Sequence, residues 1–235
     1  ARIDPQATID IIPWEISLLF AHDLAWQPRP IIQSYASFTP LLDDLDAKFL
    51  QSQAAPSQLI YSARSIDGRY AIFDTPHTFR TLLDHYRYVS ISSDGAFILL
   101  ERRTEPLSRE PILISEGKYR LEDAIPIPRI SDGYVYARVD LQPSLLGALV
   151  SLLYKPPELQ FELRLRNDET VTGRLVRETA RNGLFVSRYV RDTDDIPKVF
   201  QETGRQDIRT IRLMGSTWAY SSEFEVQFYE IPHGP

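Results

Sequence analysis

Several residue types and patterns are missing from this chain of 235 residues, and each absence excludes a class of protein or site. There is no cysteine, which excludes disulfides, thiolate metal sites and a cysteine nucleophile. No run of about 18 apolar residues occurs, so no segment of the sequence is predicted to span a membrane. The sequence also lacks a glycine-rich phosphate loop and a Gly-x-Ser-x-Gly elbow. Nucleotide binding through such a loop and serine hydrolysis of that type are therefore not expected.

Charge and histidine spacing narrow the choice of partners further. The formal charge of −6 and the pI near 5.3 argue against a nucleic-acid partner, because phosphate backbones require a concentrated basic surface. The four histidines (His22, His77, His85 and His233) show no spacing typical of metal ligands. We therefore predict no metal site and no cofactor, and the sequence shows no complete set of catalytic residues.

The first residues of the chain bear on whether it is part of a longer protein. It begins Ala1-Arg2-Ile3 without methionine, and Met214 is the only methionine. No basic stretch followed by an apolar core is present at the start. We interpret the chain as a piece of a longer protein, although a processed mature protein would begin in the same way.

Residues 1–104 alternate helical and strand patterns and predict an α/β domain. A strand is predicted at residues 31–35, another at 58–62, and a hairpin at 88–101. A first helix is indicated by apolar residues at helical spacing, with Pro13 in its first turn. These residues are Trp14, Leu18, Ala21 and Ala25.

Two Thr-Pro pairs mark the starts of two further helices, because threonine caps a helix and proline suits its first turn. The pair at residues 39–40 begins a helix whose buried stripe we expect to be Leu41, Leu45 and Phe49. The pair at residues 75–76 begins the other helix. Its predicted apolar face consists of Phe79, Leu82, Leu83 and Tyr86. The order of elements predicts a partly parallel sheet with three helices.

Residues 105–131 are punctuated by prolines and are predicted to form a connection that carries short strands and marks a domain boundary. Its Ile and Leu residues lead us to expect that the two halves pack together. From residue 132 to 235 the apolar period switches to two, as at Val135, Ala137, Val139 and Leu141. Strands of this kind predict a C-terminal antiparallel β-sandwich. The predicted fold class is thus α+β, with an α/β layer followed by the sandwich.

Two groups of residues together resemble a known class of protein. The first group is residues 13–20, Trp26, Pro28–Pro30, Gln33–Tyr35, Ala55-Pro56, 65–69, Asp74, Leu82 and Tyr86. The second group is residues 136–141, 145–147, 153–157 and 183–185. These residues resemble the C-terminal soluble region of large bacterial polytopic membrane proteins, some of which are grouped with glycosyltransferases of the dolichyl-phosphate-mannose type.

The resemblance implies a function without an active site in this chain. In that class the membrane part holds the catalytic acid, and the soluble part helps to recognise the substrate. It implies an extracytoplasmic (periplasmic) position at the bacterial cytoplasmic membrane, with the transmembrane part of the same polypeptide and a carbohydrate or lipid-linked sugar as partners. An exported hydrolase that acts on glycans and a protein-interaction domain remain the alternatives.

The candidate ligand-binding residues lie in the first half. Arg29, Gln33 and Tyr35 open the predicted strand at residues 31–35, and Asp67 and Arg69 follow the strand at 58–62. Two arginines could present planar donor groups to a phosphate, with Asp67 orienting one of them. An Asp-Gly turn and capping of a strand end are the structural alternatives. Tyr134 and Tyr136 are a further candidate, because aromatic strips on strands can stack against sugar rings.

Overall fold

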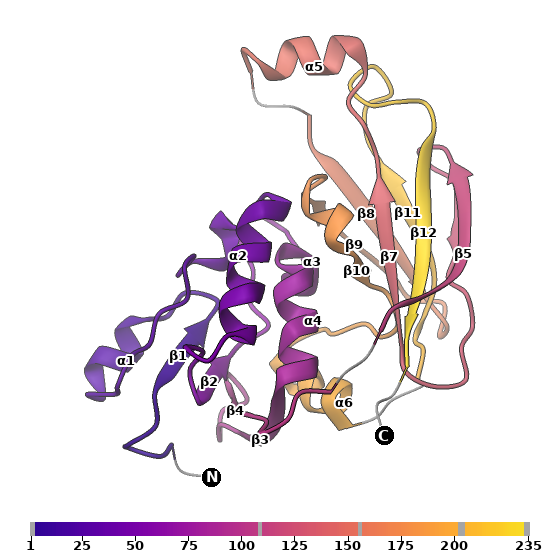
Figure 1. Cartoon of the computed structure of the whole chain (residues 1–235). Coiled ribbons are helices and arrows are strands. Elements are labelled where there is room, and N and C mark those ends of the chain that lie inside the picture. The colour runs from indigo at the N-terminus through magenta and orange to yellow at the C-terminus, as the bar shows by residue number, and fades with distance from the viewer. Residues whose placement is uncertain (1–2, 108–109, 155–156, 202–204, 233–235) are drawn as a thin grey trace.

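The chain folds into a mixed sheet with helices, followed by antiparallel sheets (Figure 1). The computed structural model describes residues 3–107, 110–154, 157–201 and 205–232. Ala1, Arg2, Lys155, Pro156 and His233, which enter the sequence arguments above, lie outside the described residues.

The first half contains one four-stranded sheet in the order β1-β2-β4-β3. Strands β1 and β2 run parallel, and the pairs β2–β4 and β3–β4 run antiparallel, so the prediction of a partly parallel sheet is confirmed. Its elements are β1 (Ile9–Ile12), α1 (Ser17–Ala21), η1 (Ser34–Ala36), α2 (Pro40–Gln51), β2 (Gln58–Tyr61), α3 (Ala71–Asp74), α4 (Pro76–His85), β3 (Tyr86–Ile91) and β4 (Ile98–Arg102).

The beginning of this half differs from the prediction. The first helix, α1, is only five residues long, and the strand expected at residues 31–35 is absent. The Ile31 amide instead donates to the Asp46 carboxylate at 2.8 Å, and η1 follows. The strand beside β2 is β1, a fully buried run that the sequence analysis missed. A short apolar run without alternation gives no periodic signal, which explains the omission.

Helix α2 begins as predicted but buries a different face. The Thr39 hydroxyl accepts a hydrogen bond from the Leu42 amide at 3.3 Å, and Pro40 lies in the first turn. The predicted stripe is wrong, since Leu41 is 67% exposed and Leu45 is 41% exposed. The buried residues follow the same helical spacing on another face, and they are Asp43, Asp46, Ala47 and Leu50. The helix turns its acids inward because partners for them lie there.

The second half contains two four-stranded sheets, in the orders β10-β7-β12-β5 and β6-β11-β8-β9, whose strand pairs are antiparallel. Its elements are β5 (Ile112–Tyr119), β6 (Ile125–Pro126), β7 (Tyr134–Asp140), α5 (Leu145–Ser151), β8 (Leu159–Leu165), β9 (Thr170–Leu175), η2 (Thr179–Asn182), β10 (Leu184–Phe185), η3 (Thr193–Asp195), α6 (Ile196–Gln201), β11 (Ile208–Met214) and β12 (Phe224–Ile231). The segment predicted as a connection contributes β5, which pairs along β12. The sandwich layering of the two sheets stays a prediction.

Strand β7 is covered on both faces over most of its length. The predicted apolar positions, Val135 and Ala137 among them, are buried, but so are Tyr134 and Tyr136 on the other face. Both tyrosine rings contact Phe185 in the core. The idea that these tyrosines form a strip for stacking sugars is therefore wrong, because their rings are used in packing.

The two halves share one hydrophobic core, which confirms the expectation that they pack together. A single cluster of buried residues draws members from the mixed sheet, from α4 and from both antiparallel sheets. Aromatic rings meet across the boundary. The ring centroids of Phe73 and Phe161 lie 5.0 Å apart, and those of Phe79 and Phe185 lie 5.6 Å apart. Such edge-on pairs add to the stability that burial alone provides.

Asp43 connects α2, α4 and η2 through hydrogen bonds. One carboxylate oxygen accepts from the Thr78 amide at 2.9 Å, and the other accepts from the His77 amide at 2.9 Å. Asn182 also donates to Asp43, at 2.9 Å. Burial raises the pKa of Asp43, and these hydrogen bonds oppose the rise. Asp43 thus caps α4 from a different helix, whereas the Thr75 side chain makes no capping hydrogen bond.

Helix α5 carries an exposed apolar face at one end of the molecule (Figure 1). Leu145, Leu152 and Leu153 are 94%, 80% and 78% exposed. Leu146, Leu149 and Tyr154 are exposed as well. None of the described helices is long and apolar enough to cross a membrane.

The opposite face of α5 is fixed to the rest of the fold by a close contact. A Cβ at Gly147 would lie 2.0 Å from the Ala219 carbonyl oxygen, so only glycine allows this approach. The Ser144 hydroxyl donates to the Trp218 carbonyl at 2.5 Å and accepts from the Gly147 amide at 2.9 Å. The leucines consequently face away from the protein.

Replacing Asp43 tests the connection between the helices. Asp43→Ala should lower the free energy of unfolding by about 3 kcal/mol or more, because it leaves the buried amide and hydroxyl donors at the start of α4 unpaired. Asp44 is the next residue, and its carboxylate is partly exposed. Asp44→Ala should therefore lower the free energy of unfolding by about 1 kcal/mol or less. Urea denaturation measures both values. Equal losses for the two variants would contradict a special role for Asp43.

Candidate functional site

Arg29, the first predicted ligand-binding residue, is buried and bound by the protein itself. Its Nη1 donates to Asp10 at 2.9 Å and to the Ile11 carbonyl at 2.6 Å. Its Nη2 donates to the Pro13 carbonyl at 2.9 Å, and its Nε lies 3.4 Å from the Asp46 carboxylate. A buried guanidinium must be paired in this way to offset its loss of hydration. Arg29 therefore has a structural environment and does not line the cavity described below.

Gln33 and Tyr35 lie near η1 and not in a strand. Gln33 is the residue directly before η1, and its side chain makes no capping hydrogen bond to that helix. The Tyr35 ring packs edge-on against Trp14 at 5.7 Å between centroids. The Tyr35 carbonyl accepts a hydrogen bond from Arg69 Nη1 at 3.1 Å. The structure thus brings Tyr35 and Arg69 together, but through the main chain of Tyr35.

Asp67 and Arg69 form a turn that pairs with the second half. Asp67 and Gly68 have φ values of 55° and 68°, the left-handed region that Asp-Gly turns favour. The Gly68 carbonyl accepts from the Arg174 amide at 2.8 Å, and Arg69 and Arg174 form an isolated parallel bridge. Arg174 lies near the end of β9, an edge strand of its sheet. The turn thereby sets Arg69 beside Arg174, which the sequence analysis did not single out.

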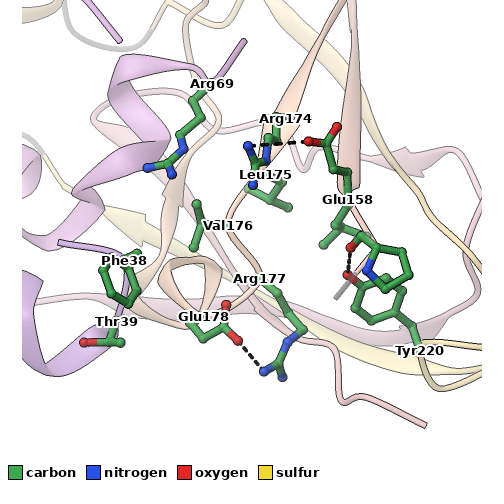
Figure 2. Close-up of a pocket in the computed structure, with 12 residues that line it drawn as sticks. Phe38, Thr39, Arg69, Glu158, Arg174, Leu175, Val176, Arg177, Glu178 and Tyr220 are labelled. Carbon is green, nitrogen blue, oxygen red and sulfur yellow. Dashed lines mark hydrogen bonds and ion pairs between the residues drawn. The ribbon is translucent and has the colours of Figure 1, made fainter. Parts of the chain in front are cut away.

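A cavity of about 440 Å³ opens next to this contact. Figure 2 shows Arg69, Phe38 and Thr39 on one side, and residues of β9 and of the segments before β8 and after β11 on the other. The lining residues are Phe38, Thr39, Arg69, Pro157, Glu158, Leu159, Arg174, Leu175, Val176, Arg177, Glu178 and Tyr220. The volume lies in the range of small-molecule sites, and both halves of the chain contribute walls.

The arginines of the cavity differ in how many of their N–H donors form hydrogen bonds within the protein. Arg177 donates to the Leu141 carbonyl at 3.1 Å and to Glu178 at 2.5 Å. Arg174 Nη1 lies 3.5 Å from the Glu158 carboxylate and 4.0 Å from that of Asp67, distances of ion pairs without a short hydrogen bond. Five N–H donors point from each guanidinium, so Arg174 has donors to spare.

Arg69 is also incompletely satisfied. Apart from its bond to the Tyr35 carbonyl, its Nη1 lies 3.9 Å from the Asp74 carboxylate. Burial raises the pKa of Asp74 to about 6, while the Ser65 hydroxyl and Arg69 oppose this rise. Near neutral pH the carboxylate is therefore ionised and helps to hold Arg69, but it leaves most of the guanidinium donors free.

Sequence reasoning found one of the two arginines at this cavity and missed the other. Arg69 was a candidate because it follows a strand in an Asp-Gly-Arg turn. No feature of the neighbouring sequence distinguishes Arg174 from other arginines that occupy alternate positions of a strand. Only the pairing of residues 68–69 with the end of β9 gives Arg174 its position. Among the described residues, no group of three or more potential metal ligands occurs.

No protein-family model matches the chain, and comparison with curated proteins and with solved structures finds no similar protein. The resemblance to the soluble region of polytopic membrane proteins therefore stays a prediction.

The buried pair of Asp46 and Arg29 predicts a measurable pH dependence. Burial raises the pKa of Asp46 from 3.8 to about 6, although Arg29 opposes part of the rise. The folded state therefore binds this proton more tightly than the unfolded chain does. The stability that results is fully present below about pH 4 and is lost as the pH rises through about 6.

Asp46→Asn removes the titrating carboxyl group, so comparing the variant with the native protein should reveal its contribution to the pH dependence of stability. The free energy of unfolding of the native protein, minus that of the variant, should fall by about 2–3 kcal/mol between about pH 4 and pH 7.5. Denaturant melts of both proteins at several pH values measure it. A difference that stays constant with pH would show that Asp46 has an ordinary pKa.

Proposed function

We propose that the chain is a non-catalytic recognition or support domain of a bacterial membrane protein, and that the exposed face of α5 contacts the lipid surface. In this proposal the two antiparallel sheets pack as a β-sandwich that carries α5 at its end. The domain then lies at the extracytoplasmic face of the cytoplasmic membrane, next to the transmembrane part of the same polypeptide. A carbohydrate or lipid-linked sugar is the expected substrate of the whole protein.

The observation that supports this proposal most strongly is the exposed face of α5. Residues 145, 149 and 152 recur at spacings of four and three, which places them on one side of the helix. Soluble proteins rarely leave several neighbouring leucines fully exposed, and large apolar patches mark contacts with proteins or membranes. The contact of Gly147 with Ala219 holds the face outward.

The composition of this end favours lipid over a protein partner. Residues 141–154 contain no charged side chain, and the large apolar side chains exposed there are leucines with Tyr154, near Trp218. Protein interfaces depend chiefly on tryptophan, tyrosine and arginine, and leucine is under-represented among their strongest contacts. Helices that lie in a membrane interface place leucine and aromatic residues on the buried face. Aromatic rings at the edge of such a face suit the headgroup region.

Vesicle binding tests the lipid contact directly. The purified chain should sediment with phosphatidylcholine vesicles, and Leu149→Ser should weaken this partitioning about tenfold or more, because a buried leucine contributes about 1.5–3 kcal/mol. Added salt or anionic lipid should change the binding little, since the face is uncharged.

Leu41→Ser is the matched control, because Leu41 is an exposed leucine on α2. It should leave vesicle binding unchanged. Failure of the native chain to bind vesicles, or equal losses in both variants, would overturn the lipid contact. The membrane-protein assignment has a separate test, since the full-length gene must encode several apolar segments of about 20 residues in the same polypeptide. A gene that encodes only a short signal peptide would favour an exported hydrolase.

A further inference from the structure

We infer that the cavity between the 67–69 turn and β9 binds a phosphate ester, with Arg69 and Arg174 holding the phosphate. The inference goes beyond the proposed function and does not depend on the contact between α5 and lipid. It assigns a ligand class to a site that lies between the two halves.

The two arginines are shielded from solvent and yet keep hydrogen-bond donors that the protein does not use. Arg69 and Arg174 are neighbours through their bridged main chains, and their side chains are only 13% and 17% exposed. The protein provides Arg69 with one hydrogen bond, to the Tyr35 carbonyl, and with an ion pair of 3.9 Å to Asp74, and it provides Arg174 with ion pairs of 3.5 and 4.0 Å. Arg29, in contrast, donates hydrogen bonds through both Nη1 and Nη2 to a carboxylate and to main-chain carbonyls. Shielded arginines with spare donors are suited to an oxyanion that completes their hydrogen bonding.

A pair of arginines discriminates between phosphate and carboxylate ligands. One arginine can satisfy both oxygens of a carboxylate through two parallel hydrogen bonds. A phosphate monoester has three terminal oxygens and a charge between −1 and −2 near neutral pH, so it can accept from two guanidinium groups at once. Two adjacent arginines therefore match phosphate better than they match carboxylate.

The rest of the cavity wall determines which group can be attached to the phosphate. Beside the arginines, much of the cavity wall is apolar and comes from both halves, with Phe38 and Val176 as examples (Figure 2). Leu159 also lines the cavity. Pro157 and Tyr220 continue this wall, and the Tyr220 hydroxyl is already bonded to the Pro157 carbonyl at 2.6 Å. A ligand with an anionic phosphate and a largely apolar body fits this division. Both a soluble aryl phosphate and the headgroup end of phosphatidic acid have this chemistry.

Replacing Glu158 distinguishes phosphate binding from a purely structural role of the arginines. Its side chain is 54% exposed and lies on the cavity wall, 3.5 Å from Arg174. A phosphate beside Arg174 would be repelled by this carboxylate. Glu158→Gln should consequently tighten phosphate binding several-fold, whereas Arg174→Ala should weaken it.

Isothermal titration of the full chain with phenyl phosphate measures these effects without vesicles. We expect binding by the native chain, at least tenfold weaker binding by Arg174→Ala and by Arg69→Ala, and tighter binding by Glu158→Gln. Arg164→Ala is the matched control, because Arg164 is an exposed arginine of β8 paired with Asp168. It should bind like the native chain. Thermal melts of each variant without ligand identify any loss that results from unfolding.

Two further probes separate the sources of the phosphate. Inorganic phosphate should bind more weakly than phenyl phosphate, because it lacks an apolar body. Monomeric short-chain phosphatidic acid that binds more tightly than phenyl phosphate would identify a lipid headgroup as the source, and the reverse order would identify a soluble ester. The site is refuted if neither phenyl phosphate nor phosphatidic acid binds, or if Arg174→Ala and Glu158→Gln leave binding unchanged. Leu149→Ser should not affect these titrations, so this inference and the lipid contact of α5 can fail separately.

Discussion

The hydrogen bonds of Asp43 are the constraint on which the arrangement of the two halves depends. This carboxylate, in the first turn of α2, accepts from the first amides of α4 and from Asn182 at the end of η2. Phe38 and Thr39 directly precede α2, and the cavity residues 174–178, at the end of β9 and after it, directly precede η2. The junction therefore sets the distance between the two walls of the cavity. A buried, multiply bonded acid is well suited to this task because its geometry is fixed by several directional contacts at once.

The arginines of this chain illustrate how the surroundings decide what a charged side chain does. Arg29 is enclosed by Asp10, Asp46 and main-chain carbonyls, so its charge stabilises the packing of α2 against β1. Arg69 and Arg174 lie at the edge of a cavity, where the protein offers them fewer acceptors. The same guanidinium group is a structural cross-link in the first setting and a potential ligand contact in the second. Burial alone does not distinguish the two, whereas counting satisfied donors does.

The two proposals concern regions that are close in the fold. The segment that follows α5 leads into Pro157 and Glu158 at the cavity, and Ala219, on which Gly147 packs, precedes Tyr220 in the cavity wall. A domain that rests on a lipid surface through α5 would hold this cavity near that surface. Such an arrangement suits recognition of a phosphate group that is presented at a membrane, although each contact stands on separate residues.

Local interactions of this protein could be derived from the sequence, because they depend on neighbours along the chain. The Thr39 cap of α2, the apolar face of α4, the β3–β4 hairpin and the alternation of buried and exposed residues along β8 and β12 were all predicted correctly. Only the tertiary structure decided which face of α2 is buried, which run pairs with β2 and which arginine accompanies Arg69. Arg69 and Arg174 lie far apart in the sequence, and their pairing depends on how a turn of one half meets the edge of β9 in the other. Periodicity describes one element at a time, so it carries no information about which donors remain unsatisfied once the elements have packed.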